Sequence, residues 1–258
     1  MLTSPKNPTI QHIRDLQARP RARREHGEFV VEGVRLVEEA LAARLTPHTL
    51  LYTPDVGPRG ETILAGFRTL GVEATPVSDA VMQAASDTQT PQGLLAVLPI
   101  QPRPLPPAPN FVLILDGVRD PGNLGTILRT AAAAGVDAFL LPPETADPYA
   151  PKVIRAGMGA HFRLSIHTLS WNEIQTVTRP LSVFLADARG EKTYTETDFT
   201  RPLALIIGGE AHGADAALQT LHPTSLRIPM PGNTESLNAA IAAGILMFEV
   251  VRQRGHAS

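Results

Sequence analysis

The chain has 258 residues, of which 43% are apolar and 19% charged, a composition typical of a folded protein with one large or two small domains. Its formal net charge is −2, so any nucleic-acid site must be a local basic patch. It has no cysteine, which excludes disulfides, thiol nucleophiles and thiolate metal sites. The N-terminus lacks the apolar segment of a signal peptide, and the longest apolar run, 237–251, is short for a membrane span and contains Glu249. We therefore expect a cytoplasmic protein with no membrane partner.

Residues 1–26 form a basic N-terminal segment. Six basic side chains oppose only Asp15 and Glu25: Lys6, Arg14, Arg19, Arg21, Arg23 and Arg24. The pattern permits two interpretations. One is a solvated, frayed terminus. The other is an arm that contacts the phosphates of a nucleic acid.

Residues 27–100 read as a small α/β domain. Short apolar runs at 29–32, 50–53 and 94–98 predict strands, and segments 33–44 and 63–70 have the apolar spacing of helices. Gly71 is a suitable residue to end the second helix. Five prolines between Gln101 and Asn110 then predict a stiff, extended linker, and we place the domain boundary at 101–110.

Residues 111–258 read as a second α/β domain with a mainly parallel sheet. The run 111–116 predicts a buried strand, a helix follows to Gly135, and 138–141 predicts the next strand, which together make a βαβ unit. Further on, 152–157 predicts a helix, and 162–166, 182–187 and 203–208 predict strands. A short strand that stops at Pro229, a proline-glycine loop and a long apolar helix from Leu237 to Val251 complete the domain.

Three predicted strands of this domain end in loops rich in glycine or proline beside polar residues. These loops are 116–129, 208–213 and 229–238. Ligands of parallel sheets bind beyond the carboxyl ends of the strands, so the three loops predict one shared site. The first loop is no P-loop, because Asn123 and Leu124 stand where lysine and serine or threonine are needed. It also lacks the first Gly-x-Gly pair of a dinucleotide fingerprint, which disfavours ATP and NAD alike.

Taken singly, the polar residues of these loops have ordinary explanations. Asn123 could be a helix N-cap, Arg129 a surface cation, and Thr234 or Ser236 the N-cap of the last helix.

Three sequences together, however, resemble the motifs of the SpoU/TrmH branch of the SPOUT RNA methyltransferases. They are Asp120-Pro-Gly-Asn-Leu-Gly-Thr-Ile-Leu-Arg-Thr-Ala131, Ile207-Gly-Gly-Glu-Ala-His-Gly213 and Ile228-Pro-Met-Pro-Gly-Asn-Thr-Glu-Ser-Leu-Asn238. The run Phe29-Val-Val-Glu-Gly-Val-Arg-Leu-Val-Glu-Glu-Ala40 also resembles the L30e-like substrate-binding domain of that family. The second motif departs from the usual Gly-Asn-Glu-Gly-x-Gly at Gly209 and Ala211.

The resemblance implies a fold that the residue pattern alone does not predict. The second domain would be a SPOUT domain with a deep trefoil knot, although general topology rules disfavour knots. The knot would form a pocket for S-adenosylmethionine, and the protein would be a homodimer packed through its knot helices. The helix 237–251 suits that role, since it is apolar on all sides and must be buried on both.

The resemblance also implies site residues. Arg129 would lie closest to the proton transfer, although a guanidinium normally stays protonated and could instead stabilise an alkoxide or hold phosphate. The residues that would position Arg129 and the ribose are Asn123, Glu210, Ser236 and Asn238. The residues that would hold the cofactor, mostly by backbone groups, are Ile207, Gly208, Gly209, Gly213, Ile228, Met230 and Leu237.

The activity so implied is methyl transfer from S-adenosylmethionine to a ribose 2′-hydroxyl of structured RNA, without a metal. The expected substrate is 23S ribosomal RNA, because the L30e-like module resembles a ribosomal RNA-binding fold. The alternatives are a tRNA 2′-O-methyltransferase and an inactive RNA-binding protein of the same fold. The arginines predicted to contact RNA, rather than to be ordinary surface charge, are Arg19, Arg21, Arg23, Arg24, Arg35 and Arg155.

Overall fold

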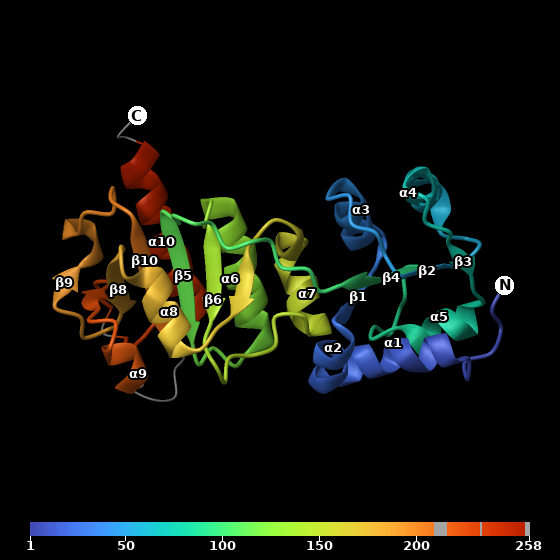
Figure 1. Cartoon of the computed structure of the whole chain (residues 1–258), viewed down its shortest axis with the longest axis horizontal. Helices are drawn as coiled ribbons and strands as arrows, with labels where there is room; N and C mark the ends of the chain where they lie inside the picture. The colour runs from blue at the N-terminus through green and yellow to red at the C-terminus, as the bar shows by residue number, and fades with distance from the viewer. Residues whose placement is uncertain (209–215, 233, 256–258) are drawn as a thin grey trace. The chain divides into compact units, whose positions relative to one another are not determined.

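The computed structural model describes residues 1–208, 216–232 and 234–255, and the chain divides into two compact units (Figure 1). The first unit contains residues 1–101 and 147–162, and the second contains residues 102–146 and those from 163 onward. The first division therefore lies at the proline-rich segment. Residues 147–162, a stretch of 16 residues between two parts of the second unit, belong to the first unit.

The first unit is built on a four-stranded sheet in the order β1-β4-β2-β3. The strands are β1 (Glu28–Glu32), β2 (Thr49–Tyr52), β3 (Thr75–Pro76) and β4 (Leu94–Pro99), and β4 runs antiparallel to both β1 and β2. Alternate residues of these strands are buried on opposite faces, as the two-residue period of a strand requires. Val31 and Leu94 pack in one cluster, whereas Val30 and Leu95 pack in the other.

Helices cover both faces of this sheet. Their bounds are α1 (Pro8–Ala18), α2 (Pro20–His26), α3 (Val34–Ala42), α4 (Gly57–Thr69), α5 (Asp79–Ala85) and α7 (Pro151–Gly157), the last followed by the short 3-10 turn η1 (Ala160–Phe162). Residues of α3, α4 and α7 pack in the cluster that contains Val31, and residues of α1 and α5 pack in the other.

The basic N-terminal segment is helical and contributes to the core. Ile10, Ile13 and Leu16 of α1 are fully buried, and Asn7 caps this helix by accepting a 2.9 Å hydrogen bond from the backbone N–H of Thr9. Pro20 stands in the first turn of α2, which explains why the chain breaks at Arg19 and continues as a second helix. The frayed terminus considered from the sequence is therefore wrong.

The prediction that Arg23 contacts RNA is wrong. Its side chain is 3% exposed, and Nη2 lies 2.7 Å from Oδ2 of Asp147. Nη1 donates to the carbonyl oxygens of Leu16 and Gln17, the latter at 3.0 Å. A buried guanidinium with these partners holds the first unit together and is not available to RNA.

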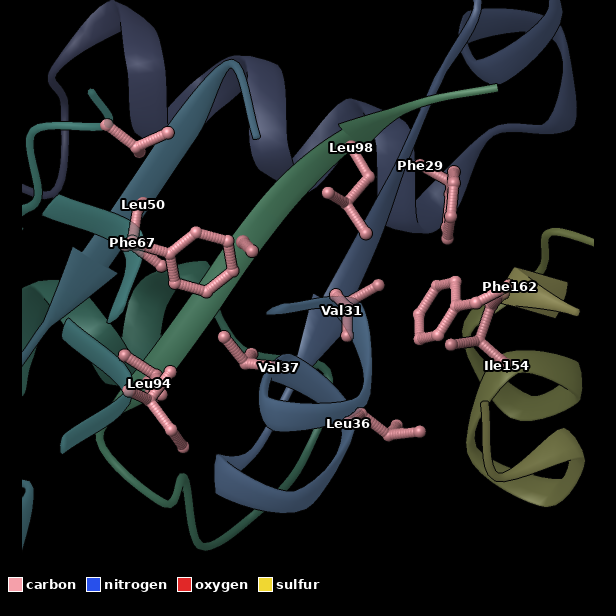
Figure 2. Packing of buried hydrophobic residues seen from close by; sticks show 14 of the residues in the cluster. Phe29, Val31, Leu36, Val37, Leu50, Phe67, Leu94, Leu98, Ile154 and Phe162 are labelled. Atoms are coloured by element: carbon pink, nitrogen blue, oxygen red, sulfur yellow. The ribbon is translucent and has the colours of Figure 1, made fainter. Parts of the chain in front are cut away.

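The segment 147–162 supplies part of the first unit's core. Ile154 is 2% exposed and Phe162 is 6% exposed, and both lie in one cluster with Phe29, Val31 and Leu36 (Figure 2). Arg155 forms a 2.8 Å ion pair with Asp87 of the same unit. The sequence pattern predicts this segment in the second domain, because it follows a βαβ unit of that domain along the chain.

His161 in this segment is held as a neutral imidazole. Its Nε2 lies 2.7 Å from the carbonyl oxygen of Pro148, which can only accept, so Nε2 carries the proton. Nδ1 is buried without a partner among the described residues. Burial lowers the pKa of His161 to about 4, and the pKa of neighbouring Tyr149 is raised to about 12 by burial and by the charge of Asp147.

The second unit is built on a seven-stranded parallel sheet in the order β7-β6-β5-β10-β8-β11-β9. The strands are β5 (Phe111–Asp116), β6 (Ala138–Leu141), β7 (Ile166–Thr168), β8 (Ser182–Ala186), β9 (Lys192–Thr193), β10 (Leu203–Gly208) and β11 (Thr224–Arg227). The helical elements are α6 (Pro121–Ala134), α8 (Trp171–Thr178), η2 (Tyr194–Glu196), α9 (Ala216–Gln219) and α10 (Ala239–Gly255). The α/β class and the parallel sheet are as predicted, and the knot stays a prediction.

Two predicted strands are shifted. The run 162–166 was expected as a strand, but the chain turns through Met158 and Gly159 at φ 47° and 85°, and pairing with β6 starts only at Ile166. The strand expected to stop at Pro229 ends at Arg227, before the proline that could not donate to a neighbouring strand. None of the helices in the described part of the chain is long and apolar enough to cross a membrane.

Candidate functional site

A cavity of about 220 Å³ opens at the carboxyl ends of three neighbouring strands of the second unit. These strands are β8, β10 and β11, which lie side by side in the sheet. The residues that line the cavity are Ala186, Asp187, Ala188, Ile207, Gly208, Leu226, Ile228, Met230, Ser236, Leu237, Ala239 and Ala242. Its wall is mostly apolar, with strand-end backbone and a few polar groups, which suits a ligand with a flat apolar part and a polar tail.

Most of the residues predicted to hold a cofactor meet at this cavity. Those that line it are Ile207, Gly208, Ile228, Met230 and Leu237. Gly209 and Gly213 lie outside the described residues. Ser236, predicted for catalysis, also lines the cavity and is exposed. The rule that ligands bind beyond the carboxyl ends of parallel strands therefore predicted the edge of the sheet at which this cavity lies.

The start of α6 places Asn123 beside this region. Asp120 is the N-cap, since its Oδ1 accepts a 2.7 Å hydrogen bond from the backbone N–H of Asn123. The ordinary explanation of Asn123 as the N-cap is therefore wrong. With the cap supplied by Asp120, the side chain of Asn123 is free to make another interaction.

That interaction is with Asn238, the residue before α10. Nδ2 of Asn238 donates a 3.0 Å hydrogen bond to Oδ1 of Asn123. Oδ1 of Asn238 accepts from the backbone N–H groups of Ala240 at 2.9 Å and Ile241 at 3.4 Å, so Asn238 caps α10. One amide thus ends the third motif, starts a helix and fixes a residue of the first motif 115 positions away. Thr234 and Ser236, which the sequence also offered as caps of this helix, lie before Asn238 in the chain and are not its cap.

The remaining polar residues of α6 have different surroundings. Arg129 is exposed, and among the described residues it has no hydrogen-bond or ion-pair partner. The hydroxyls of Thr126 and Thr130 each donate to the carbonyl oxygen four residues earlier, both at 2.8 Å. Glu210, predicted to act with Arg129, lies outside the described residues. The structure therefore brings Asn123 and Asn238 together and leaves the guanidinium of Arg129 open to solvent.

The arginines predicted to contact RNA belong to the first unit. Arg19 pairs with Asp15 at 3.1 Å and Arg21 pairs with Glu25 at 2.6 Å, each on the surface of its helix. Arg24 and Arg35 are exposed. Arg155 is half-buried in its pair with Asp87, and Arg23 is buried as described above. Pairs at the surface contribute little to stability, so Arg19 and Arg21 can exchange their carboxylates for phosphates at small cost.

The cavity wall that follows β8 was not predicted from the sequence. Ala186, Asp187 and Ala188 line the cavity, and Asp187 is the one ionisable side chain among its described lining residues. Its Oδ1 accepts a 2.8 Å hydrogen bond from the backbone N–H of Arg189, and its own N–H donates to the carbonyl of Leu226 at 2.9 Å. The signal was present, because Asp187 ends a predicted parallel strand. No group of three or more histidine, aspartate or glutamate residues suited to a metal occurs in the described ranges.

Comparison with known proteins identifies both units. Residues 110–248 match the model of the SpoU rRNA Methylase family, and residues 7–96 match the MRM3-like substrate binding domain. The 23S rRNA (guanosine(2553)-2′-O)-methyltransferase RlmP of Bacillus subtilis is 33% identical over 96% of this chain and 98% of its own. The 23S rRNA (uridine(2479)-2′-O)-methyltransferase of Streptomyces viridochromogenes is 31% identical over 96% of this chain and 91% of its own.

A solved structure agrees in fold. The AdoMet-bound rRNA methyltransferase from Sinorhizobium meliloti superimposes with a TM-score of 0.86, at 33% identity and 97% coverage of each chain. The family model covers more than half of this chain, and the relatives match nearly its whole length. The chain therefore belongs to the SpoU rRNA methylase family.

Proposed function

We propose that the protein transfers a methyl group from S-adenosylmethionine to a ribose 2′-hydroxyl of 23S ribosomal RNA. The observation that carries this proposal is the cavity at the ends of β8, β10 and β11 beside the Asn123–Asn238 pair, in a chain of this family. Two relatives that span nearly the whole chain are named as 23S rRNA 2′-O-methyltransferases, and they modify a guanosine and a uridine respectively. The bacterial cytoplasm, where such RNA is found, is the location that follows.

The cofactor would bind in the cavity. Its apolar lining, including Ile207, Ile228 and Leu237, suits the adenine ring, and the backbone at Gly208 and Met230 can supply polar contacts. A neighbour of the same fold is described as AdoMet-bound. Gly209 and Gly213 of the second motif remain part of this proposal.

The reaction needs alignment and removal of one proton. The sulfonium already activates the methyl group, so the protein must place the hydroxyl oxygen, the methyl carbon and the sulfur in line and help the hydroxyl lose its proton. Asn123 and Asn238 would position the ribose, because each amide is fixed by the other and by a helix start. Ser236, on the cavity wall, and Glu210 would complete this set.

Arg129 would act as a cation. A guanidinium stays protonated in proteins, so it is suited to stabilising the developing alkoxide or holding the adjacent phosphate rather than to accepting the proton. Its exposed position on α6, the helix that also carries Asn123, lets RNA reach it.

We also propose a homodimer formed through α10. Ile241 and Phe248 stand two turns apart on this helix and are 55% and 48% exposed, and Val251 is 37% exposed. Large apolar side chains with such exposure on one helix are typical of an interface. The trefoil knot implied by the family resemblance belongs to the same proposal.

The first unit would bind the RNA. It matches a substrate-binding domain, and its exposed cations Arg24 and Arg35 can contact phosphates directly. Arg19, Arg21 and Arg155 would do so by exchanging the surface carboxylates with which they pair.

The test is methyl transfer from tritiated S-adenosylmethionine to separate pools of ribosomal RNA and tRNA. Alkali-resistant label in a dinucleotide of the ribosomal pool is the expected result, because a methylated 2′-hydroxyl blocks hydrolysis of the next phosphodiester. Label in tRNA alone would overturn the assignment of substrate, and no label in either pool would overturn the activity.

A variant pair examines the role of Arg129. Arg129→Ala should abolish transfer while cofactor binding, measured by calorimetry, stays within about twofold of wild type. Arg179→Ala, which removes an exposed arginine after α8, is the matched control and should keep full activity. Retained transfer in Arg129→Ala, or a loss that merely follows lost cofactor binding, would contradict the proposed role.

A further inference from the structure

A second cavity, of about 410 Å³, lies in the first unit between the end of β2 and the start of β4. It is polar, and α5 forms its other wall. The residues that matter for its chemistry are Thr53, Asp55, Asp79, Met82, Gln92 and Gly93. This volume is large enough for a nucleobase and its ribose.

Thr53 is the most informative residue of this cavity. It is 4% exposed and lines the cavity, and its hydroxyl has no hydrogen-bond partner in the described part of the chain. Its backbone is fully used, since its N–H donates to the carbonyl of Gly93 at 2.9 Å and its carbonyl accepts from Val56 at 3.1 Å. Because Thr53 lines the cavity and its hydroxyl is not engaged within the described residues, this group can hydrogen-bond a ligand.

Gly93 keeps the hydroxyl at the cavity wall. Its φ is +73°, and a Cβ placed on it would lie 2.3 Å from Oγ1 of Thr53. Only glycine combines this backbone angle with so close an approach. The neighbouring Gln92 accepts a 3.3 Å hydrogen bond from the backbone N–H of Val34 with its Oε1, which leaves its amide NH₂ facing other partners.

The charges of the cavity restrict its ligand. Asp55 and Asp79 both line it, both are exposed, and no cation is among its lining residues. Carboxylates repel phosphates, so this cavity cannot hold the RNA backbone. Beside RNA they can act only as acceptors for donors on a base edge or a ribose hydroxyl. Met82 lines the cavity but is 1% exposed, so it makes a small part of the wall apolar.

We propose that this cavity binds an unstacked guanine of the substrate RNA. The Watson–Crick edge of guanine offers two adjacent donors, N1–H and the N2 amino group, which match a carboxylate, while its O6 accepts from a hydroxyl or an amide NH₂. Asp79 or Asp55 takes the donors, and Thr53 and Gln92 take the acceptor. This inference rests on the proposed RNA substrate and adds a base-specific contact far along the chain from the reacting residues.

The first experiment uses the full chain and free nucleosides, which carry no phosphate. Guanosine titrated to millimolar concentration should shift the backbone amide resonances of Thr53 and Gly93, and adenosine and uridine should not. Thr53→Val replaces the hydroxyl with a methyl group of similar size. It should weaken guanosine binding about fivefold or more, and it should leave thermal stability nearly unchanged, because the hydroxyl has no partner in the described part of the chain. Absence of guanosine shifts, or equal shifts with all three nucleosides, would overturn the proposal.

The second experiment measures whether the affinity for ribosomal RNA falls or rises when a carboxylate of the cavity is neutralised. At least one of Asp55→Asn and Asp79→Asn should weaken RNA binding about fivefold or more, whereas removal of a negative charge from a surface with no base contact should leave or strengthen it. Glu61→Gln, at an exposed position of α4, is the matched control. Unchanged or tighter binding by both aspartate variants would refute the base contact. Absence of methyl transfer by the wild type would instead refute the proposed activity, so the two failures are distinguishable.

Discussion

The hydrogen bond between Asn123 and Asn238 can be tested apart from the helix cap that Asn238 also provides. Asn238→Ala removes both interactions of this side chain. Loss of an N-cap costs about 1 kcal/mol, and loss of a side-chain hydrogen bond costs about 1 kcal/mol. We therefore expect the free energy of unfolding of the second unit to fall by about 2 kcal/mol.

Asn238→Asp separates the two effects. A carboxylate still accepts from the N–H groups of Ala240 and Ile241 and interacts favourably with the helix N-terminus, but it has no donor for Oδ1 of Asn123. Its cost should be about 1 kcal/mol or less. Asn123→Ala removes the same hydrogen bond from the other side and leaves both caps intact, again at about 1 kcal/mol.

Urea unfolding followed by the fluorescence of Trp171 is the assay. Trp171 is the only tryptophan of the chain and packs against the core of the second unit, so its signal reports on the unit that contains α6 and α10. In the double variant Asn123→Ala with Asn238→Ala, the loss should be about 1 kcal/mol smaller than the sum of the single losses. Additive losses would refute the coupling. Asn238→Asp should also reduce methyl transfer despite its intact cap, because the hydrogen bond to Oδ1 of Asn123 is then lost.

Three further predictions concern other features of the two units. Asp187→Asn should weaken binding of S-adenosylmethionine about three- to tenfold. Binding of S-adenosylhomocysteine should weaken less, because only S-adenosylmethionine carries the sulfonium charge. Calorimetry with both ligands measures the two affinities, and equal losses would contradict an electrostatic role of Asp187. Phe248→Arg should give a monomer in analytical ultracentrifugation, and a persistent dimer would exclude this face of α10 as the interface. His161 has its pKa lowered to about 4 by burial, so the unfolded chain takes up a proton below about pH 6.5 while the folded chain does not. The contribution of His161 to stability should therefore be constant above pH 6.5 and fall by about 3 kcal/mol towards pH 4. Urea midpoints followed by circular dichroism should show a flatter profile for His161→Gln.

Much of the sheet of the second unit could be predicted from local pattern. Buried parallel strands are continuous apolar runs, and 111–116 and 203–208 stand out for that reason. The edge elements could not be placed in this way. The strand β9 is two residues long. The strand expected at 162–166 overlaps the 3-10 turn η1, and its pairing begins only at Ile166.

A frayed terminus was considered for the basic N-terminal segment because its charges conceal a core helix. Ile10, Ile13 and Leu16 have helical spacing, yet the arginines that follow suggest a solvated segment. The partner that buries Arg23 is Asp147, 124 positions away, and no local pattern indicates such a pair. Burial of a single arginine depends on tertiary structure that composition does not contain.

The location of the candidate site was predictable, and its chemistry was less so. Three strand-end loops were expected to meet at one edge of a parallel sheet, and the cavity lies at that edge, although no residue of the first loop, 116–129, lines it. Which amide caps which helix could not be read from the sequence, because Asp120, Asn123, Ser236 and Asn238 are all plausible caps. The structure separates them, since Asp120 and Asn238 cap the helices and Asn123 is held by Asn238.

The membership of residues 147–162 in the first unit limits how this chain can be divided or recombined. A fragment that ends at the proline-rich segment would lack Ile154 and Phe162 from its core and would leave the buried guanidinium of Arg23 without its carboxylate. If the substrate-binding domain were exchanged between relatives at the proline-rich segment alone, the core of the new domain would have to pack against α7 of the other protein. A viable chimera has to carry the helix α7 together with the sheet on which it packs. The first unit is therefore encoded by two separate stretches of the gene, and both must be exchanged together.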